Sequence, residues 1–456
     1  MAGGNIVFRL DGTPGFIHDR PAVRAAWERH SAGRESVEQG QCLITGEFGP
    51  IARLHDSIKG VVGAQSTGAS IVSFNLPAFE SYGKEQSFNA PVSEAAAFGY
   101  VTALNFLLRS DRHRLRIGDA TTVFWAERAA AVEEDMLAEL IDPIGAARGG
   151  GGADRAEGTE VTGDYRRDPQ ATRLVHDILR RVRDGRPVLA GATRVNPEVR
   201  FYILGLSPNA SRLSVRFLHV DTFGNLIERI AQHYADMAIA LPAWDEDGFF
   251  PIWHIVKETA PLADTRRASP LLAGALTRAV LEGADYPESL YTAMISRIRA
   301  DQKIDPVRAG MIKACLLRRA RIHGNSDKKE MITVSLNEQC ADTAYLLGRL
   351  FALLEKAQRD ATPGLNATIR DRYFGAASAT PQSVFPILLR LAQHHIAKAE
   401  YGGLLDKRIE DVVTRIDSFP AHLSLEQQGM FVLGYYQQRQ AFYRKKSAEA
   451  AMAEGD

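Results

Sequence analysis

Residues 73–109 read SFNLPAFESYGKEQSFNAPVSEAAAFGYVTALNFLLR, and the character of the stretch changes at Pro91. Before the proline, three phenylalanines alternate with side chains that form hydrogen bonds: Asn75, Ser81, Tyr82, Lys84, Gln86 and Asn89. After it, Ser93 is suited to N-cap a helix, and apolar side chains recur at helical spacing at Ala96, Tyr100, Ala103, Leu104 and Leu107. The stretch predicts a polar loop that is pinned by a helix packed on a core.

The composition of this loop has two interpretations. A lysine can neutralise a phosphate, amides read base edges, and aromatic rings stack on bases. On this interpretation Asn75, Tyr82, Lys84, Gln86 and Asn89 contact nucleic acid. Alternatively, the same amides satisfy the backbone of the loop itself, and the loop is structural. Residue types alone leave both interpretations open.

A glycine-rich segment lies just upstream. Residues 59–70 read KGVVGAQSTGAS. Glycines and small hydroxyls let a backbone approach a phosphate closely, so Lys59 and Ser66 are candidate DNA contacts. No Gly-Lys-Ser/Thr ends the segment, so it is not a P-loop. A loop that connects strands is the alternative.

Two β-hairpins are expected in the first half of the chain. Residues 115–117 and 122–125 alternate around a Gly-Asp turn, and residues 200–206 and 212–220 alternate around Ser-Pro-Asn-Ala at 207–210. Asn209 and Arg212, near the tip of the second hairpin, suit a surface that faces a ligand. A plain β-turn, with the proline and asparagine serving the turn, is the alternative.

The most basic part of the chain is residues 291–330, which hold ten Lys/Arg against four Asp/Glu. Within it, Asp305 is a suitable N-cap with Pro306 at the first helical position. Apolar residues after the proline form one stripe, so the arginines should lie on the opposite face. Because their charge is one-sided, we expect Arg318, Arg319 and Arg321 to contact phosphates; a merely solvated helix face is the alternative.

The fold class that follows is α+β. We expect an N-terminal α+β domain over residues 1–145, a disordered glycine-rich linker or loop over 146–168, and a middle α+β domain over 169–330 that ends in the basic helices. Residues 331–456 carry four amphipathic helices with short connections, which predicts an antiparallel bundle.

Bulk composition limits the class of protein. The chain has 456 residues, 55 Lys/Arg and 55 Asp/Glu, so its formal net charge is zero. A protein that binds DNA through bulk positive charge would not have this balance. No apolar run approaches a membrane span. The three cysteines, Cys42, Cys315 and Cys340, are far apart, which fits a reducing compartment and a cytoplasmic location.

The sequence shows no catalytic motif that predicts an active site, and no cofactor is expected. Glu80, Lys84 and Glu85 are the loosest possible match to a metal-dependent nuclease, without a preceding aspartate in a strand motif. His394 and His395 are adjacent on a helix, so they point in different directions and cannot hold one metal together. A nuclease centred on residues 80–85 and a scaffold that touches only proteins remain the alternatives.

Four strings spread along the chain resemble one protein family. They are CLITGEFGPIARLHDSIKGVVGAQSTGASIVSFN (42–75), FYILGLSPNASRLSVRF (201–217), AYLLGRLFALLEKAQ (344–358) and TIRDRYFGAASATPQSVFPILL (368–389). Together they resemble the large subunit of the subtype I-C CRISPR surveillance complex, Cascade. Members of that family carry a further segment before the position equivalent to Asn5, so this chain is expected to lack it.

The resemblance implies a non-catalytic, RNA-guided role in antiviral defence. The family's large subunit sits beside the crRNA 5′ end, contacts the backbone and crRNA-processing Cas subunits, and helps recognise the protospacer-adjacent motif in target double-stranded DNA. Cleavage belongs to a recruited helicase–nuclease. The helical C-terminal region resembles the small subunits that line the displaced strand.

The resemblance also implies a second product of the same gene, because subtype I-C systems make a separate small subunit from within the large-subunit gene. Here Asp327-Lys328-Lys329-Glu330 precede Met331, and lysine and glutamate codons consist of purines, as bacterial ribosome-binding sites do. We therefore expect Met331, or Val334 if its codon is GTG, to start a small subunit that ends at Asp456.

Overall fold

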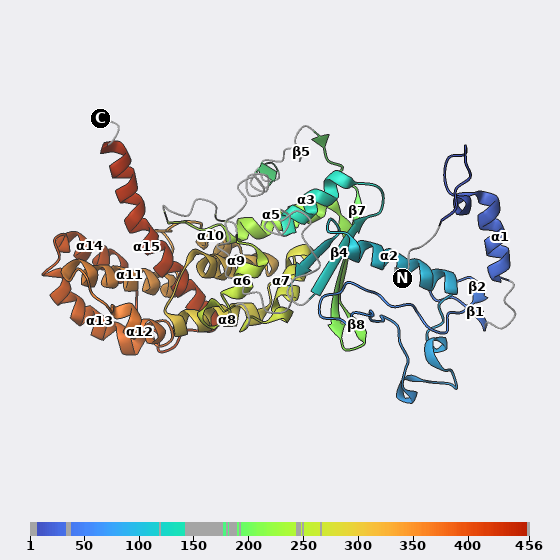
Figure 1. The fold of residues 1–456 in the computed structure, drawn as a ribbon. Helices are drawn as coiled ribbons and strands as arrows, with labels where there is room; N and C mark the ends of the chain where they lie inside the picture. The colour runs from blue at the N-terminus through green and yellow to red at the C-terminus, as the bar shows by residue number, and fades with distance from the viewer. Residues whose placement is uncertain are drawn as a thin grey trace. The chain divides into compact units, whose positions relative to one another are not determined.

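The computed structural model describes residues 7–32, 38–117, 120–141, 193–242, 250–264 and 267–453, and in addition 177, 178, 181, 189, 190 and 248. Two compact units divide the chain (Figure 1). Unit 1 holds residues 1–109 together with Pro208–Ser214, and unit 2 holds the remainder. The predicted linker at 146–168 lies outside the described residues.

Unit 1 is built around helix α2 (Glu94–Arg109). The predicted cap is confirmed, because the Ser93 hydroxyl accepts a hydrogen bond from the Ala96 N–H at 3.3 Å. The predicted core stripe is confirmed at Leu104, and Ala96 and Tyr100 are partly buried against the core. The other buried positions are Ala97, Val101 and Leu108, which were not predicted. The remaining elements are α1 (Pro21–Ala32), the short antiparallel strands β1 (Gln39–Gln41) and β2 (Phe48–Pro50), and the single turns η2 (Pro77–Phe79) and η3 (Gln86–Asn89).

The central sheet has the order β3-β4-β7-β8. Its strands are β3 (Arg114–Ile117), β4 (Ala120–Ala126), β7 (Arg200–Asn209) and β8 (Arg212–Thr222), so both expected hairpins are confirmed. β7 continues through Pro208, so the second turn is Ala210-Ser211 and not 207–210. At Gly205 a Cβ would lie 2.5 Å from the Phe217 ring, so this position must be glycine for Phe217 to enter the core.

Helices follow β8 in unit 2. They are α5 (Phe223–Met237), α6 (Ile252–Lys257), α7 (Pro270–Glu282), α8 (Glu288–Asp301), α9 (Pro306–Ile322) and α10 (Ser326–Met331), with α3 (Ala131–Ile141) between β4 and the two-residue strands β5 (Leu189–Ala190) and β6 (Thr193–Arg194). α5 and α9 approach closely, because a Cβ at Gly310 would lie 2.8 Å from the Met237 carbonyl oxygen.

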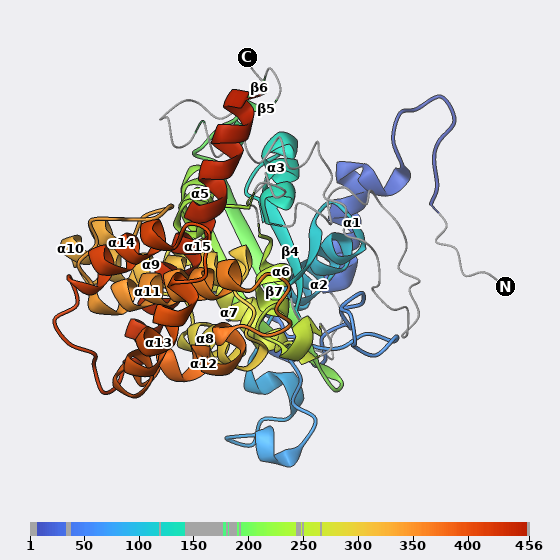
Figure 2. The same ribbon diagram turned by 90° about the vertical axis from the view of Figure 1, so that its left-hand side faces the viewer.

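The C-terminal region is helical, as expected, and the α+β class is confirmed. Its helices are α11 (Thr343–Ala361), α12 (Ile369–Ala377), α13 (Pro381–Ile396), α14 (Gly402–Val413) and α15 (Leu425–Ala453), which lie together in Figure 2. The sequence analysis missed α12. Gly348 and Gly434 let α11 and α15 touch: a Cβ there would lie 2.0 Å from the Phe431 carbonyl and 2.2 Å from the Tyr345 carbonyl.

A buried carboxylate ties α5 to α9. Asp236 is fully buried and accepts two hydrogen bonds from the Arg321 guanidinium, at 2.8 and 2.7 Å. The Arg318 Nε donates to the same carboxylate at 3.3 Å, and Lys313 Nζ donates to the Asp236 backbone carbonyl at 2.8 Å. Burial lowers the pKa of Lys313 to about 8. The carboxylate and backbone carbonyl of Asp236 therefore bind three of the cations that α9 carries into the core.

Replacing this carboxylate by an amide tests its role. In Asp236→Asn, Arg318 and Arg321 keep their positions but lose their counter-charge, which should cost about 3–5 kcal/mol of unfolding free energy. Urea unfolding of the full chain measures this loss. Glu400→Gln is the matched control, because Glu400 is exposed and has no partner among the described residues; it should change stability by less than about 0.5 kcal/mol. Equal stability of the two variants would contradict the assignment.

Candidate nucleic-acid interface

The predicted polar loop of unit 1 ends in a tight turn at residues 81–84. The Lys84 N–H donates to the Ser81 carbonyl at 3.0 Å, and Tyr82 and Gly83 have φ angles of 54° and 69°. Two successive left-handed residues define the type I′ turn of a two-residue hairpin. Tyr82 is 100% exposed, and the Lys84 ammonium has no partner among the described residues. We call residues 81–84 the loop tip.

A tyrosine is an unfavourable choice for this turn. The left-handed conformation costs a residue with a Cβ roughly 1–2 kcal/mol, and glycine, asparagine or aspartate usually occupies the position. Burial of the ring does not offset the cost, because the Tyr82 side chain lies in solvent. Backbone strain of this kind is common where a side chain is presented to a ligand.

Asn89 holds the loop tip in place. Its Oδ1 accepts from the Ser81 N–H at 2.9 Å, and its Nδ2 donates to the carbonyls of Lys84 and Gln86 at 2.8 and 2.9 Å. All the strong hydrogen-bonding groups of the amide are therefore used within the loop. The prediction that Asn89 contacts nucleic acid was wrong for this geometry, and the structural alternative holds at this residue.

Gln86 also supports the loop, but only in part. Its Oε1 accepts from Arg53 Nη1 at 2.7 Å, and its backbone N–H donates to Glu80 Oε1 at 3.3 Å. Its Nε2 makes no hydrogen bond within the described residues. Arg53 and Glu80 are supporting residues that the sequence analysis missed, because neither spacing nor composition relates Arg53 to a position 33 residues away.

The tip of the β7–β8 hairpin belongs to unit 1 and joins the same loop region. An Arg212 Nη donates to Asn75 Oδ1, and the Arg212 guanidinium lies over the Phe79 ring at 4.5 Å. The Leu213 N–H donates to the Ser70 carbonyl at 2.9 Å. The structure thus brings Asn75 and Arg212 together, and the hydrogen bond between them uses the Asn75 oxygen and one of the five N–H groups of Arg212. Asn209, next to the turn, is exposed.

The glycine-rich segment is a second loop of unit 1. Ile58 and Ala69 exchange backbone hydrogen bonds of 2.9 Å, so residues 58–69 close on themselves, and Asn105 of α2 accepts from the Lys59 N–H at 2.7 Å. Gly68 has a φ of +100°, and a Cβ there would lie 2.7 Å from the Ser57 Cβ. The loop therefore presents Lys59 and Ser66, which are exposed, on a fixed backbone. The Lys59 ammonium has no partner in the described part of the chain.

The arginines of the basic helix α9 do not lie on an exposed face opposite the apolar stripe. The predicted stripe of Val307, Met311 and Ala314 is buried, but so is most of the rest of the helix. Arg318 is 1% exposed and bonded to Asp236, Arg321 binds the same carboxylate, and Arg319 Nη2 donates to Glu288 at 2.5 Å. Arg318 is therefore buried away from any DNA phosphate, whereas Arg319 and Arg321 are partly exposed, so their contact with DNA stays a prediction.

The acid that allows this burial is far away in the sequence, so it was not predicted. Asp236 lies 82 and 85 residues before the two arginines that it binds, and no local pattern relates them. Arg308 of the same helix is likewise buried against Glu258 at 3.0 Å and Asp301 at 2.8 Å. The excess of positive charge in this segment is therefore paired with acidic residues from other parts of the chain.

The loop offers no further metal ligand among the described residues to support the nuclease alternative. Glu80 is engaged with the Gln86 N–H, and Glu85 is exposed. Within the ranges that the structure describes, no three His, Cys, Asp or Glu side chains come together in a way that could hold a metal ion. Among the described helices, none is both long and apolar enough to cross a bilayer.

The clamp by Asn89 can be tested at single residues. In Asn89→Ala the Ser81 N–H loses its acceptor and the loop loses three hydrogen bonds, two of them at the loop tip, so amide hydrogen exchange at Ser81 should accelerate by roughly ten- to a hundredfold. Lys84→Ala is the control, because only the backbone of Lys84 takes part in the turn. Unchanged exchange in Asn89→Ala would show that the turn does not depend on this amide.

Comparison with known proteins places the chain. A search of the curated proteins finds no match. A family profile described as CRISPR-associated protein (Cas_Csd1) matches residues 1–443. Because the match covers nearly the whole length, including both units, the chain belongs to the Cas_Csd1 family of CRISPR-associated proteins.

Proposed function

We propose that this chain is the non-catalytic large subunit of a subtype I-C crRNA-guided DNA surveillance complex. The observation that carries the proposal is the family match over residues 1–443, which makes the chain a CRISPR-associated protein. The four strings quoted above support the finer assignment to subtype and subunit. In such a complex, guide–target pairing reads the sequence, while protein reads a short adjacent motif and holds backbone.

The geometry of unit 1 supports a direct contact with duplex DNA. The loop tip presents a strained, fully exposed tyrosine and an unpaired lysine on a backbone that Asn89 fixes. A ring and a cation on a rigid turn suit stacking and phosphate contact. We propose that Tyr82 and Lys84, with Lys59, Ser66 and Asn209, face the DNA near the protospacer-adjacent motif.

The charge balance supports a shared role in a complex. With 55 Lys/Arg and 55 Asp/Glu, the chain lacks the excess of cations that carries non-specific DNA affinity. Several of its arginines are also consumed in buried ion pairs. We propose that the backbone and crRNA-processing Cas subunits supply most of the affinity for guide and target, and that a helicase–nuclease recruited to the complex cleaves the DNA.

Removing the one cation of the loop tip tests this proposal. Lys84→Ala in the assembled complex should weaken binding of target duplex and reduce the slope of log affinity against log salt by about one. Arg109→Ala is the matched control, since Arg109 is an exposed cation of the same unit without a partner in the described residues; it should leave the slope unchanged. If Lys84→Ala binds with the same affinity and slope, unit 1 contacts protein partners only.

The proposed internal product agrees with the contacts of the C-terminal region. The segment before α11 is bonded to the bundle: Gln437 Nε2 donates to the Thr333 carbonyl at 2.7 Å, and the Asn337 N–H donates to Tyr345 Oη at 3.0 Å. Arg415 donates to the carbonyls of residues 338–340. A polypeptide that starts at Met331 would therefore keep all these contacts, and one that starts at Val334 would keep those of residues 337–340.

Expression of the gene with a C-terminal tag tests the internal start. We expect a small tagged product whose intact mass places its first residue at Met331 or Val334. Synonymous recoding of residues 327–330 should reduce it, and removal of both start codons should abolish it. A small product that survives both changes arises by proteolysis, and no product at all would equally overturn the proposal.

A further inference from the structure

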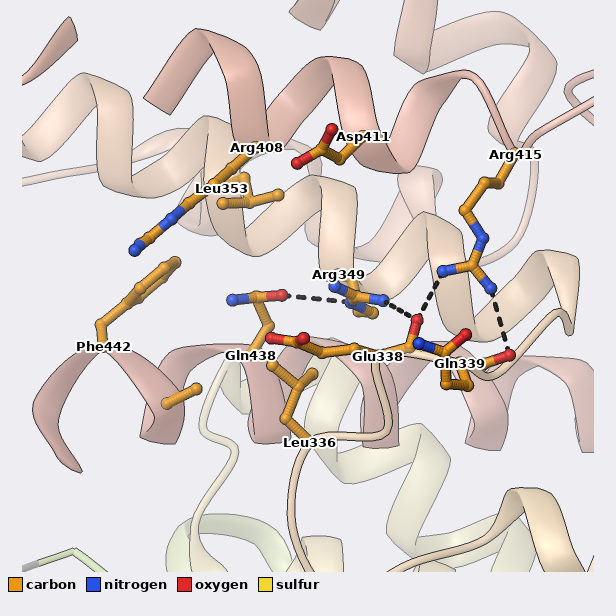
Figure 3. A pocket seen from close by; sticks show the side chains of 11 residues that line it. Leu336, Glu338, Gln339, Arg349, Leu353, Arg408, Asp411, Arg415, Gln438 and Phe442 are labelled. Carbon is orange, nitrogen blue, oxygen red and sulfur yellow. Dashed lines mark hydrogen bonds between the residues drawn. The ribbon is translucent and has the colours of Figure 1, made fainter. Parts of the chain in front are cut away.

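The C-terminal bundle contains a polar cavity of about 420 Å³. It lies between α11, α14 and α15 and is closed on one side by the segment around residues 336–339 (Figure 3). Three arginines and two acids line it: Arg349, Arg408, Arg415, Glu338 and Asp411. Its volume suits a small molecule or one unit of a polymer, whereas its polar lining does not suit an apolar ligand.

Arg349 carries a positive charge at the base of this cavity that no carboxylate of a described residue binds directly. It is 7% exposed, and its guanidinium donates to Gln438 Oε1 at 3.1 Å and to the Glu338 carbonyl at 3.3 Å. Both acceptors are neutral, and no carboxylate of a described residue forms an ion pair with it. Burial lowers the pKa of Arg349, and the nearby Tyr345 and Glu338 act in the opposite direction.

Other buried arginines of the same chain form ion pairs with carboxylates, unlike Arg349. Arg308 and Arg318, each 1% exposed, bind carboxylates at 2.8–3.3 Å. A buried guanidinium is costly unless an opposite charge compensates it. Arg349 therefore lacks within the described chain the type of partner that its counterparts have, and an anion that enters the cavity would supply it.

The other two arginines define where such an anion can lie. Arg415 donates to three successive carbonyls, at 2.5, 3.2 and 2.8 Å, so it holds the wall of the cavity. Arg408 makes no hydrogen bond or ion pair with any described residue, and it extends from α14 towards the ring of Phe442 on α15 (Figure 3). A free guanidinium and an aromatic ring thus border the same opening.

We propose that this cavity binds a nucleoside phosphate, with the phosphate between Arg349 and Arg408 and the base against Phe442. The guanidinium fork matches phosphate oxygens, and aromatic rings and arginines both stack on bases. Glu338 and Asp411 accept hydrogen bonds from sugar hydroxyls or base amines. They also leave a single excess positive charge among these five groups, which favours one phosphate over a triphosphate chain.

A nucleoside phosphate can come from a free mononucleotide or from one unit of a single strand, and two probes distinguish these sources. Fluorescence anisotropy of the purified full chain is measured with a fluorescent AMP analogue and with a short fluorescein-labelled oligothymidylate. Saturable binding of AMP identifies a free nucleotide, and binding of the oligonucleotide alone identifies a strand. Binding of neither probe overturns the proposal. The measurement needs no crRNA complex, and the variants of Arg408 and Phe442 below separate binding in the cavity from binding at the loop tip, so this inference and the proposed function can fail independently.

Variants connect the binding to the cavity. Arg408→Ala should weaken binding at least about tenfold, because it removes charge-assisted hydrogen bonds but no contact within the protein. Arg408→Lys should recover part of the affinity. Phe442→Leu should weaken binding of both probes without changing competition by inorganic phosphate.

The matched control is Lys407→Ala, an exposed cation one residue away on α14 that does not line the cavity. It should bind like the unmodified chain. An equal loss in Lys407→Ala and Arg408→Ala, or unchanged binding in Arg408→Ala, would place the ligand elsewhere and overturn the proposal.

Discussion

The Asp236 carboxylate lets a strongly basic helix lie inside the protein. It is fully buried, it binds the guanidinium groups of Arg318 and Arg321, and its backbone carbonyl accepts from Lys313. α9 in turn packs against α15 and shares one continuous core with the bundle. The position of the C-terminal helices on the middle of the chain therefore depends on the neutralisation of α9.

Because the cations of α9 are bound to acids inside the protein, they are not the ones to consider first for nucleic-acid contact. The arginines of α9 form ion pairs within the protein. Lys59 and Lys84, by contrast, lie on loops of unit 1, and their ammonium groups have no partner among the residues that the structure describes. Isolated cations on fixed turns give specific contacts and little bulk affinity. A neutral chain of this kind fits a subunit that adds discrimination to a complex whose other members hold the nucleic acid.

Local patterns predicted the parts of the fold that local physics determines. The Ser93 cap, the two hairpins, the start of α9 at Asp305-Pro306 and four of the five described C-terminal helices follow from spacing and turn chemistry, whereas α12 was not predicted. The prediction that the arginines of α9 lie on an exposed face did not anticipate that Arg318 and Arg321 bind Asp236, a residue of α5. Asn89 was misassigned because an amide in a loop looks the same in sequence whether it meets a base or its own backbone. The strain at Tyr82 depends on a backbone angle that composition does not reveal.

A photo-crosslink would show whether the loop tip faces DNA. p-Benzoylphenylalanine placed at Tyr82, which is fully exposed, would be irradiated in the complex assembled on target duplex. The same group at Phe106, an exposed aromatic of unit 1 on α2, serves as the control. If the loop tip faces DNA, we expect a covalent adduct with the DNA from position 82 and not from position 106. An adduct at position 82 with a protein subunit alone would contradict it.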